Sequence, residues 1–344
     1  MARKDSLQAV LTGCGGISGA WLNPVSTFDD IEIVGLVDLD LGNAKAAKDK
    51  FGLENAICGT DLAQVLEQTT PDVVFDVTVP EAHCQVTLTA LEYGCHVLGE
   101  KPLATNMSDA RKMVDAAEEN GKTYAVIQNR RYNDNIIRYR NAVQSPDLGD
   151  LTTLNADFYL GPHFGGFRAA MQNVLLRDMA IHSFDQARFI SGKDPVSVYC
   201  HEWNPKGSWY THGASAVAIF EMTDDVVFTY RGSWCAQGLQ TAWECDWRAI
   251  GTNGTATWDG AETIRCEVVD PDSEDFFRKT VQPNLPEHTP LKYTSHAGVI
   301  REFVDSIKSG GTPQTVCTDN IRSLAMVDAA IESAAAGKKI EIAI

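Results

Sequence analysis

The sequence predicts an α/β protein in two parts: a doubly wound parallel sheet, then an α+β part built on antiparallel strands. In the first half, short apolar runs alternate with helix-like segments, and strands joined by such crossovers run parallel. After Asn133, apolar and polar residues alternate one by one, which is typical of antiparallel strands with one solvated face. We place the domains at residues 1–130 and 131–344, divided at this change of period.

The parallel strands are predicted where apolar runs end in turn-forming residues, at 7–11, 31–37, 73–77, 96–98 and 124–127. Helices are predicted between them. One follows the first strand until Pro24 interrupts it, and another begins at Pro80 and ends at Gly94. A third begins behind Ser108 and ends at Gly121.

The second part is predicted to be a meander of strands. The first strand has four apolar residues on one face, Leu154, Ala156, Phe158 and Leu160. The sequence Thr252-Asn253-Gly254 predicts a hairpin turn in which glycine takes a positive φ. Two helices close the chain, one carrying Val299, Ile300, Phe303 and Val304 and one at about 321–336, and they fit either domain. Further strands are expected at 196–203, 215–223, 226–234 and 243–250.

Composition excludes several classes of function. The 344 residues include 29 Lys and Arg and 46 Asp and Glu, a net charge of −17, so nucleic acid and anionic membranes are not expected partners. No apolar run reaches the roughly 18 residues that span a bilayer, and no cleavage pattern follows Arg3 and Lys4, so we expect a cytoplasmic protein. Nine cysteines without a C-x-x-C pair favour reduced thiols over disulfides, and no metal site is expected.

A glycine-rich loop, Gly13-Cys14-Gly15-Gly16-Ile17, joins the first strand to the first helix. Its bare backbone suits a diphosphate held at the helix N-terminus. Asp38 ends the second strand, where a carboxylate accepts hydrogen bonds from the adenosine ribose hydroxyls and repels a 2′-phosphate. The sequence therefore predicts NAD as the cofactor, in preference to NADP. Aspartate also commonly begins a turn at the end of a strand, and Asp38 is open to that interpretation.

Three charged or ionisable residues suggest catalysis. Lys101, in Gly99-Glu100-Lys101-Pro102, follows a strand at the edge where parallel sheets bind ligands. Asp178 and His182 are four residues apart in a helix-compatible stretch, so they share one helix face. A carboxylate beside an imidazole makes it a better general base near neutral pH. A surface lysine and an ordinary helix-surface ion pair would give the same pattern.

Taken together, these motifs resemble the Gfo/Idh/MocA family, named after glucose-fructose oxidoreductase, inositol dehydrogenase and rhizopine catabolism. Besides those already named, the resemblance rests on Thr78-Val79-Pro80 with His83, and on Asn129-Arg130-Arg131-Tyr132. It spans nearly the whole chain, and it departs from the family pattern at Ser18 in the glycine loop and at Glu81.

The resemblance implies an N-terminal Rossmann domain and a C-terminal domain with a large, mostly antiparallel sheet, in a homodimer or homotetramer. It implies catalytic roles for Lys101, Asp178 and His182. Glu100 and Asn129 are implied near the nicotinamide, and Arg130 near the substrate. The expected cofactor contacts are Gly13, Gly15, Gly16, Ile17, Asp38, Thr78, Pro80, His83, Glu100, Lys101 and Asn129.

The expected reaction is hydride transfer between NAD and a secondary hydroxyl of a sugar, inositol or related cyclic polyol. His182 would accept the hydroxyl proton, Asp178 would orient its ring, and Lys101 would stabilise the oxygen; Lys101 is the alternative proton acceptor. Two other functions remain open. One is glycoside hydrolysis through transient oxidation by NAD, and the other is non-catalytic regulation by a dinucleotide- and sugar-binding protein.

The second domain is expected to hold the substrate. Six of the seven tryptophans lie there, suited either to the C–H faces of a sugar or, for the majority, to the core and a subunit interface. The loop at 161–168 is better placed to meet a ligand than the strands are. The expected substrate contacts, beyond the catalytic residues, are Arg130, Tyr159, His163 and Arg168; Arg168 is also a candidate for covering the cofactor diphosphate.

Overall fold

The computed structural model describes residues 6–285 and 287–344, which divide into two compact units. The first unit runs to Asn129 and includes Lys292–Leu324, and the second comprises Arg130–Leu291 and Ala325–Ile344. The sequence left open which domain the closing helices belong to, and residues 292–324 are part of the first unit. Residues 1–5 of the expected first domain lie outside the described residues. Within the described ranges, no helix has both the length and the apolar character needed to cross a membrane.

The first unit contains a parallel sheet of six strands, in the order β3-β2-β1-β4-β5-β6. The predicted doubly wound sheet is therefore confirmed. Strand β3 was not predicted, because its three residues are exposed or half-buried and form no apolar run. The strands are β1 (Leu7–Thr12), β2 (Ile31–Val37), β3 (Ile57–Gly59), β4 (Val73–Asp76), β5 (His96–Gly99) and β6 (Tyr124–Val126).

Helices connect these strands, and their ends correct three of the predicted boundaries. Asn106, not Ser108, caps the helix after β5, because its extended backbone lets the side chain accept from the Asp109 N–H. Pro24 lies inside the last turn of the first helix. Pro80 lies in a turn before the fourth. The helices are α1 (Ser18–Val25), α2 (Leu41–Phe51), α3 (Leu62–Thr69), α4 (His83–Glu92) and α5 (Met107–Glu119).

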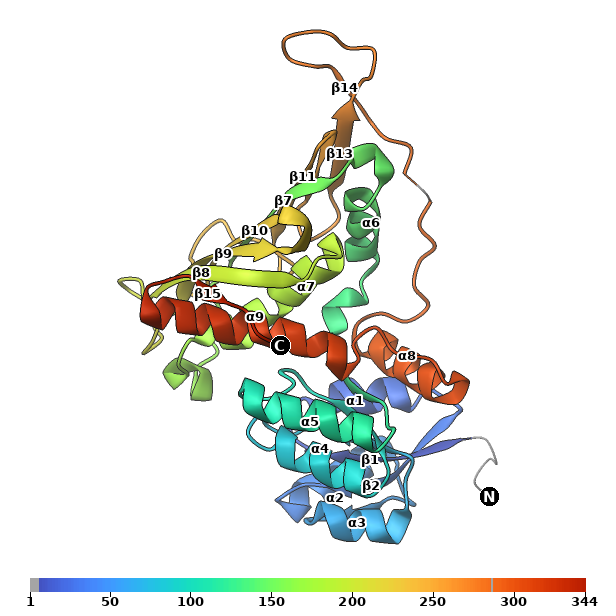
Figure 1. The fold of residues 1–344 in the computed structure, drawn as a ribbon. Helices are drawn as coiled ribbons and strands as arrows, with labels where there is room; N and C mark the ends of the chain where they lie inside the picture. The colour runs from blue at the N-terminus through green and yellow to red at the C-terminus, as the bar shows by residue number, and fades with distance from the viewer. Residues whose placement is uncertain (1–5, 286) are drawn as a thin grey trace. The chain divides into compact units, whose positions relative to one another are not determined.

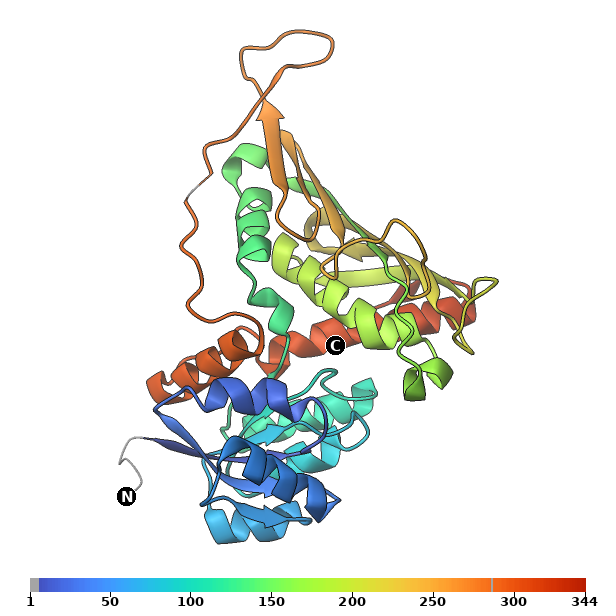
Figure 2. The ribbon, with the colours of Figure 1, turned by 180° about the vertical axis from the view of Figure 1, so that it is seen from behind.

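Helices cover both faces of this sheet. On one face α3, α4 and α5 pack together with the first residues of α9 (Cys317–Ala336); α4 and α5 lie in front of the sheet in Figure 1. Helix α1 packs against α8 (Ser295–Ser309), and it is seen in dark blue from behind in Figure 2. Because both faces are covered, Ala9, Val10 and Leu11 of β1 are completely buried.

The second unit contains a nine-stranded sheet in the order β14-β13-β12-β11-β7-β10-β9-β8-β15. The pairing is antiparallel except between β7 and β10, which run parallel. The strands are β7 (Leu151–Tyr159), β8 (Pro195–Trp203), β9 (Ser215–Met222), β10 (Val227–Ser233), β11 (Asp246–Gly251), β12 (Gly254–Trp258), β13 (Ile264–Val269), β14 (Thr280–Val281) and β15 (Ile340–Glu341).

The central strand β7 corrects the prediction of a purely antiparallel strand. Its alternation is as predicted, with Leu154, Ala156 and Phe158 buried on one face. The parallel neighbour arises because the chain leaves β7, passes through a helix and two hairpin-joined strands, and returns as β10 in the same direction. The large, mostly antiparallel sheet itself is confirmed.

The predicted hairpin at residues 252–254 is present between β11 and β12, but its glycine serves a different purpose. Gly254 belongs to β12 and does not have a positive φ. A Cβ at this position would lie 2.5 Å from the carbonyl oxygen of Glu267 on the neighbouring strand. Gly254 is therefore explained by the close approach of two backbones.

One face of the nine-stranded sheet packs on α6 (Asp134–Val143) and α7 (Ile181–Ser191), which Figure 1 shows against it. Tyr139 of α6 and Phe184 of α7 belong to this core. Trp234, Trp247 and Trp258 are also buried in it, so half of the tryptophans that cluster in this part of the sequence are core residues.

Candidate active site

The predicted cofactor residues of the first unit lie along one edge of its sheet. This is the edge formed by the carboxyl ends of the parallel strands, where open α/β sheets bind ligands. Gly13, Gly15, Gly16 and Ile17 follow β1, and Asp38 follows β2. Thr78, Pro80 and His83 follow β4, Glu100 and Lys101 follow β5, and Asn129 follows β6.

The glycine loop leaves open space where a diphosphate would approach. Gly13 has φ +91°, and a Cβ there would lie 2.4 Å from the carbonyl oxygen of Val77. Gly15 and Gly16 have no atom within 4 Å of a Cβ position. Ser18, at the position of the usual third glycine, is buried, and its hydroxyl donates to the Gly15 carbonyl at 2.7 Å. The loop therefore fits a dinucleotide despite the serine.

Substitution of Gly13 by alanine is expected to lower the free energy of unfolding by about 2 kcal/mol or more, because a positive φ and a backbone clash both oppose the methyl group. The midpoint of urea denaturation measures this effect. Gly16→Ala is the matched control: it should change stability by less than about 0.5 kcal/mol, yet weaken NAD binding by filling the open space. Equal destabilisation by both variants would contradict this account of the loop.

Asp38 is tied to the glycine loop. Its Oδ2 accepts the Cys14 N–H at 2.8 Å, and its Oδ1 accepts the Asp40 N–H at 2.9 Å. Oδ1 also accepts from Asn43 Nδ2 at 3.2 Å, and because a carboxylate oxygen can accept two hydrogen bonds, Oδ2 keeps capacity for a ribose hydroxyl. Burial raises the pKa of the Cys14 thiol to about 12, with the Asp38 charge adding to the rise, so this thiol stays neutral beside the carboxylate.

His83 is buried, with about 1% of its surface exposed. Its ring nitrogens contact two backbone carbonyl oxygens, Nδ1 that of Pro102 at 2.9 Å and Nε2 that of Thr78 at 3.2 Å. The structure thus gives His83 contacts within the protein, while Thr78 and Pro80 in the same turn are half-buried and accessible.

Glu100 is held by residues from three elements. Its Oε1 accepts the indole N–H of Trp21 at 2.8 Å and lies 3.8 Å from Nε2 of His296, and its Oε2 accepts the Lys101 N–H at 3.2 Å. Burial raises the pKa of Glu100, but the nearby His296 and the hydrogen bond from Trp21 outweigh it, and the net pKa lies below its ordinary value. Glu100 is therefore a carboxylate beside Lys101, whose peptide bond to Pro102 is cis.

His296 and Ser295 were not predicted as site residues. They begin α8, and Asn129 Nδ2 donates to Ser295 Oγ at 3.1 Å and lies 3.4 Å from His296 Nδ1. The sequence indicated only the apolar face of this helix, because nothing local marks a contact across more than 160 residues. Trp21 was not predicted as a site residue either.

In the second unit, Asp178 and His182 are both buried, at 8% and 7% exposure. The predicted helical stretch is present, but Asp178 lies in a π-helical turn (Leu175–Ala180) and His182 in the first turn of α7. Such wide turns occur often at functional sites. The Asp178 carboxylate accepts hydrogen bonds from two guanidinium nitrogens of Arg168, at 2.7 and 3.3 Å.

Arg168 joins Asp178 to an aromatic loop. Its guanidinium lies 5.1 Å from the ring centre of Phe164 and 4.7 Å from that of Phe167. The Phe164 ring contacts the buried Trp234, with 5.8 Å between the ring centroids, and Trp234 packs edge-on against Trp243, with 5.7 Å between their centroids. We call Phe164, Trp234 and Trp243 the aromatic row. Its two outer members, Phe164 and Trp243, are each about half exposed to solvent.

The remaining predicted substrate residues also lie in the second unit. Arg130 donates to the carbonyl oxygen of Trp243 and pairs with Glu244 at 3.4 Å. The His163 ring stacks on Trp209, 3.7 Å between centroids. Tyr159, at the end of β7, is half-buried, and burial raises its pKa. Arg130, Arg168 and Asp178 are therefore linked through contacts inside the second unit.

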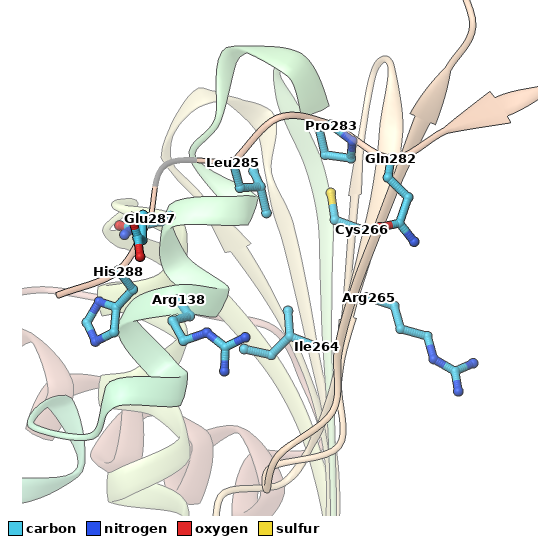
Figure 3. A pocket seen from close by; sticks show the side chains of 10 residues that line it. Arg138, Ile264, Arg265, Cys266, Gln282, Pro283, Leu285, Glu287 and His288 are labelled. Atoms are coloured by element: carbon cyan, nitrogen blue, oxygen red, sulfur yellow. The ribbon is translucent and has the colours of Figure 1, made fainter. Parts of the chain in front are cut away.

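A different cavity, of about 310 Å³, lies between α6, β13 and the connection that follows β14 (Figure 3). Its lining within the described residues includes Arg138, Cys266 and His288, and none of the predicted site residues. His288 in this lining pairs with Asp134 at 2.6 Å. This cavity is thus separate from the predicted site.

Two family models match the chain. Residues 7–128 match the oxidoreductase family with an NAD-binding Rossmann fold, and residues 136–257 match the GFO/IDH/MocA C-terminal domain. The chain therefore belongs to the Gfo/Idh/MocA family of oxidoreductases, which confirms the resemblance seen in its motifs and the presence of an NAD-binding domain.

The individual relatives share only a quarter to a third of their residues with this chain. D-apiose dehydrogenase of Paraburkholderia graminis is 27% identical, with 97% of this chain and 89% of that protein covered. D-glucoside 3-dehydrogenase of Escherichia coli is 34% identical over 53% of each chain. Among solved structures, an oxidoreductase of Agrobacterium radiobacter, crystallised with NAD+, L-tartaric acid and magnesium, superposes with a TM-score of 0.85 at 22% identity, covering 98% of both chains.

Proposed function

We propose that this protein is an NAD-dependent dehydrogenase that oxidises, or in reverse forms, a secondary hydroxyl on a sugar, inositol or related cyclic polyol. The observation that carries the proposal is Lys101, which follows β5 beside the ionised Glu100, in the row of predicted nucleotide contacts. The names of the relatives, which are dehydrogenases of apiose and glucosides, support the same class of substrate.

The first unit fits NAD. The open backbone at Gly15 and Gly16 would hold the diphosphate, and Asp38 would accept from the adenosine ribose. A 2′-phosphate would meet the Asp38 charge, and its neighbours Leu39 and Asp40 are exposed and provide no cation. These features favour NAD over NADP. When bound, NAD supplies a nicotinamide ring that exchanges hydride with the substrate carbon.

The chain's own residues would handle the proton and the charge on oxygen. We assign His182 to accept the hydroxyl proton and Asp178 to orient its ring, while Lys101 hydrogen-bonds the same oxygen as its negative charge grows. The burial of Asp178 and His182 supports this assignment, because an imidazole screened from water transfers protons in a fixed geometry.

The substrate end is supported by the aromatic row. Half-exposed faces of Phe164 and Trp243 suit the apolar C–H faces of a cyclic polyol. Arg168 is paired with Asp178 and Arg130 with Glu244, so both arginines of this region already have carboxylate partners. An uncharged substrate, whose hydroxyls exchange hydrogen bonds with these groups, fits better than one carrying a phosphate.

Assaying a panel of sugars, inositols and other cyclic polyols with NAD and with NADP tests the proposal. We expect steady NADH formation from at least one of them, with kcat/KM for NAD at least about tenfold above that for NADP. Asp38→Ala should reduce that preference, because the repulsion of the 2′-phosphate is removed. A preference for NADP would contradict the role of Asp38.

Two outcomes would overturn the proposed reaction. Cleavage of glycosides without net NADH would instead support a hydrolase that uses NAD as a transient oxidant. Ligand binding without turnover across the whole panel would support a regulator.

A further inference from the structure

A buried pair of ionisable residues, unused in the chemistry above, lies beneath the ends of β4 and β5. Asp76 is the last residue of β4, and His83 is the first residue of α4. Each has about 1% of its surface exposed. With so little exposed surface, both side chains face the interior of the protein and contact its own residues.

The His83 ring joins two loops through hydrogen bonds. Its nitrogens face the carbonyl oxygens of Pro102 and Thr78, at 2.9 and 3.2 Å. A carbonyl oxygen can only accept, and a neutral imidazole has a single N–H to donate. Both hydrogen bonds therefore form only when the ring carries two protons and a positive charge.

Asp76 provides the opposite charge. Its Oδ1 accepts the Thr78 N–H at 3.1 Å and the Thr78 hydroxyl, while its Oδ2 is buried and has no hydrogen-bond partner among the described residues. Burial, with the charge of Glu100, raises the pKa of this carboxyl above its ordinary value, and the charge of His83 and the Thr78 hydrogen bonds offset only part of the rise. An ionised carboxylate in this position needs a cation nearby.

We propose that Asp76 and His83 carry opposite charges and form an ion pair bridged by Thr78, without direct contact, which fastens the Thr78 turn to the Lys101 loop and thereby positions Lys101. Both residues hold Thr78, Asp76 through its N–H and hydroxyl and His83 through its carbonyl oxygen. His83 also holds the carbonyl oxygen of Pro102, the residue after Lys101. The positioning of Lys101 rests on the proposed function, whereas the ion pair does not.

The protonation of His83 tests the ion pair directly. In the full-length protein labelled with ¹⁵N-histidine, the resonances lost in His83→Gln identify this ring. We expect both of its nitrogens to be protonated at neutral pH, and Asp76→Asn to convert the ring to a singly protonated form. Thr87→Val, a buried and uncharged change one turn along α4, should leave these resonances unchanged. A singly protonated His83 in the unmodified protein would overturn the ion pair.

Kinetics test the positioning role. Asp76→Asn should lower kcat roughly ten- to a hundredfold, because a small displacement of Lys101 is costly, while the dissociation constant of NADH, measured by fluorescence, changes less than about threefold. In a Lys101→Met background, the same substitution should cause no further loss. An equal loss in both backgrounds would overturn positioning through Lys101. Full turnover by Lys101→Met alone would overturn the role of Lys101 and its positioning, leaving the ion pair to be decided by the ¹⁵N signals.

Discussion

His182→Ala is expected to lower kcat by about 100- to 10,000-fold, because the variant loses the group that we assign to accept the hydroxyl proton. The dissociation constant of NAD should change by less than about threefold, since the predicted nucleotide contacts belong to the first unit and His182 to the second. Steady-state kinetics on the best substrate of the panel, together with fluorescence titration of NADH, measure both quantities.

The matched control is His201→Ala, which removes an exposed histidine that stacks on Trp203 in the same unit. It should leave kcat within about twofold of the unmodified protein. Near-normal turnover by His182→Ala would contradict its assignment as the base and leave Lys101 as the candidate proton acceptor.

Lys101→Met is expected to lower kcat by about 100- to 1,000-fold, because it removes the positive charge and donor near the developing alkoxide while keeping the apolar stem. Lys101→Arg should not restore turnover, since the planar guanidinium cannot take the place of a compact ammonium. Single-turnover measurements with saturating NAD separate this effect on chemistry from any effect on binding.

Lys112→Met is the control. Lys112 is exposed on α5, and its ion pair in the described part of the chain is with Asp109, at 2.9 Å. Its loss should change kcat by less than about twofold. If Lys101→Met were no more harmful than this variant, the oxygen-stabilising role would be wrong.

The first unit could be predicted from the sequence because its strands are buried on both faces and therefore appear as apolar runs. The predicted strand at residues 31–37 coincides with β2. Strand β3 was not predicted because it is short and its residues are exposed or half-buried. The start of α5 was misplaced by two residues, because Ser108 and Asn106 are both good caps and only the backbone conformation distinguishes them.

In the second unit, alternation predicted which residues of β7 face the core, but not which strands lie beside it. Period-two patterning reports the two faces of a strand and contains no information about its neighbours. The parallel partner β10 therefore could not be inferred. The same limit applies to Gly254, where glycine indicated a turn and the structure requires it for contact with the next strand.

The candidate site was predictable where its residues are local in sequence. The glycine loop and Asp38 were picked out because each follows a predicted strand, but the hydrogen bond between the Cys14 N–H and Asp38, across 24 residues, was not predicted. The contacts of Glu100 with Trp21 and His296 join segments far apart in the chain, and no pattern in either segment marks them. Arg168 was expected to contact the substrate or the cofactor. Its pairing with Asp178 depends on the conformation of the loop at 161–168, which the sequence does not give.

The parallel pairing of β7 with β10 also bears on the order in which the protein folds. Phe164, Arg168, Asp178 and His182 all lie in the segment between these two strands. Closing a segment of this length is entropically costly, so contacts of high sequence separation form slowly. We therefore expect the residues assigned to the substrate to reach their native positions only after β7 and β10 have paired during refolding.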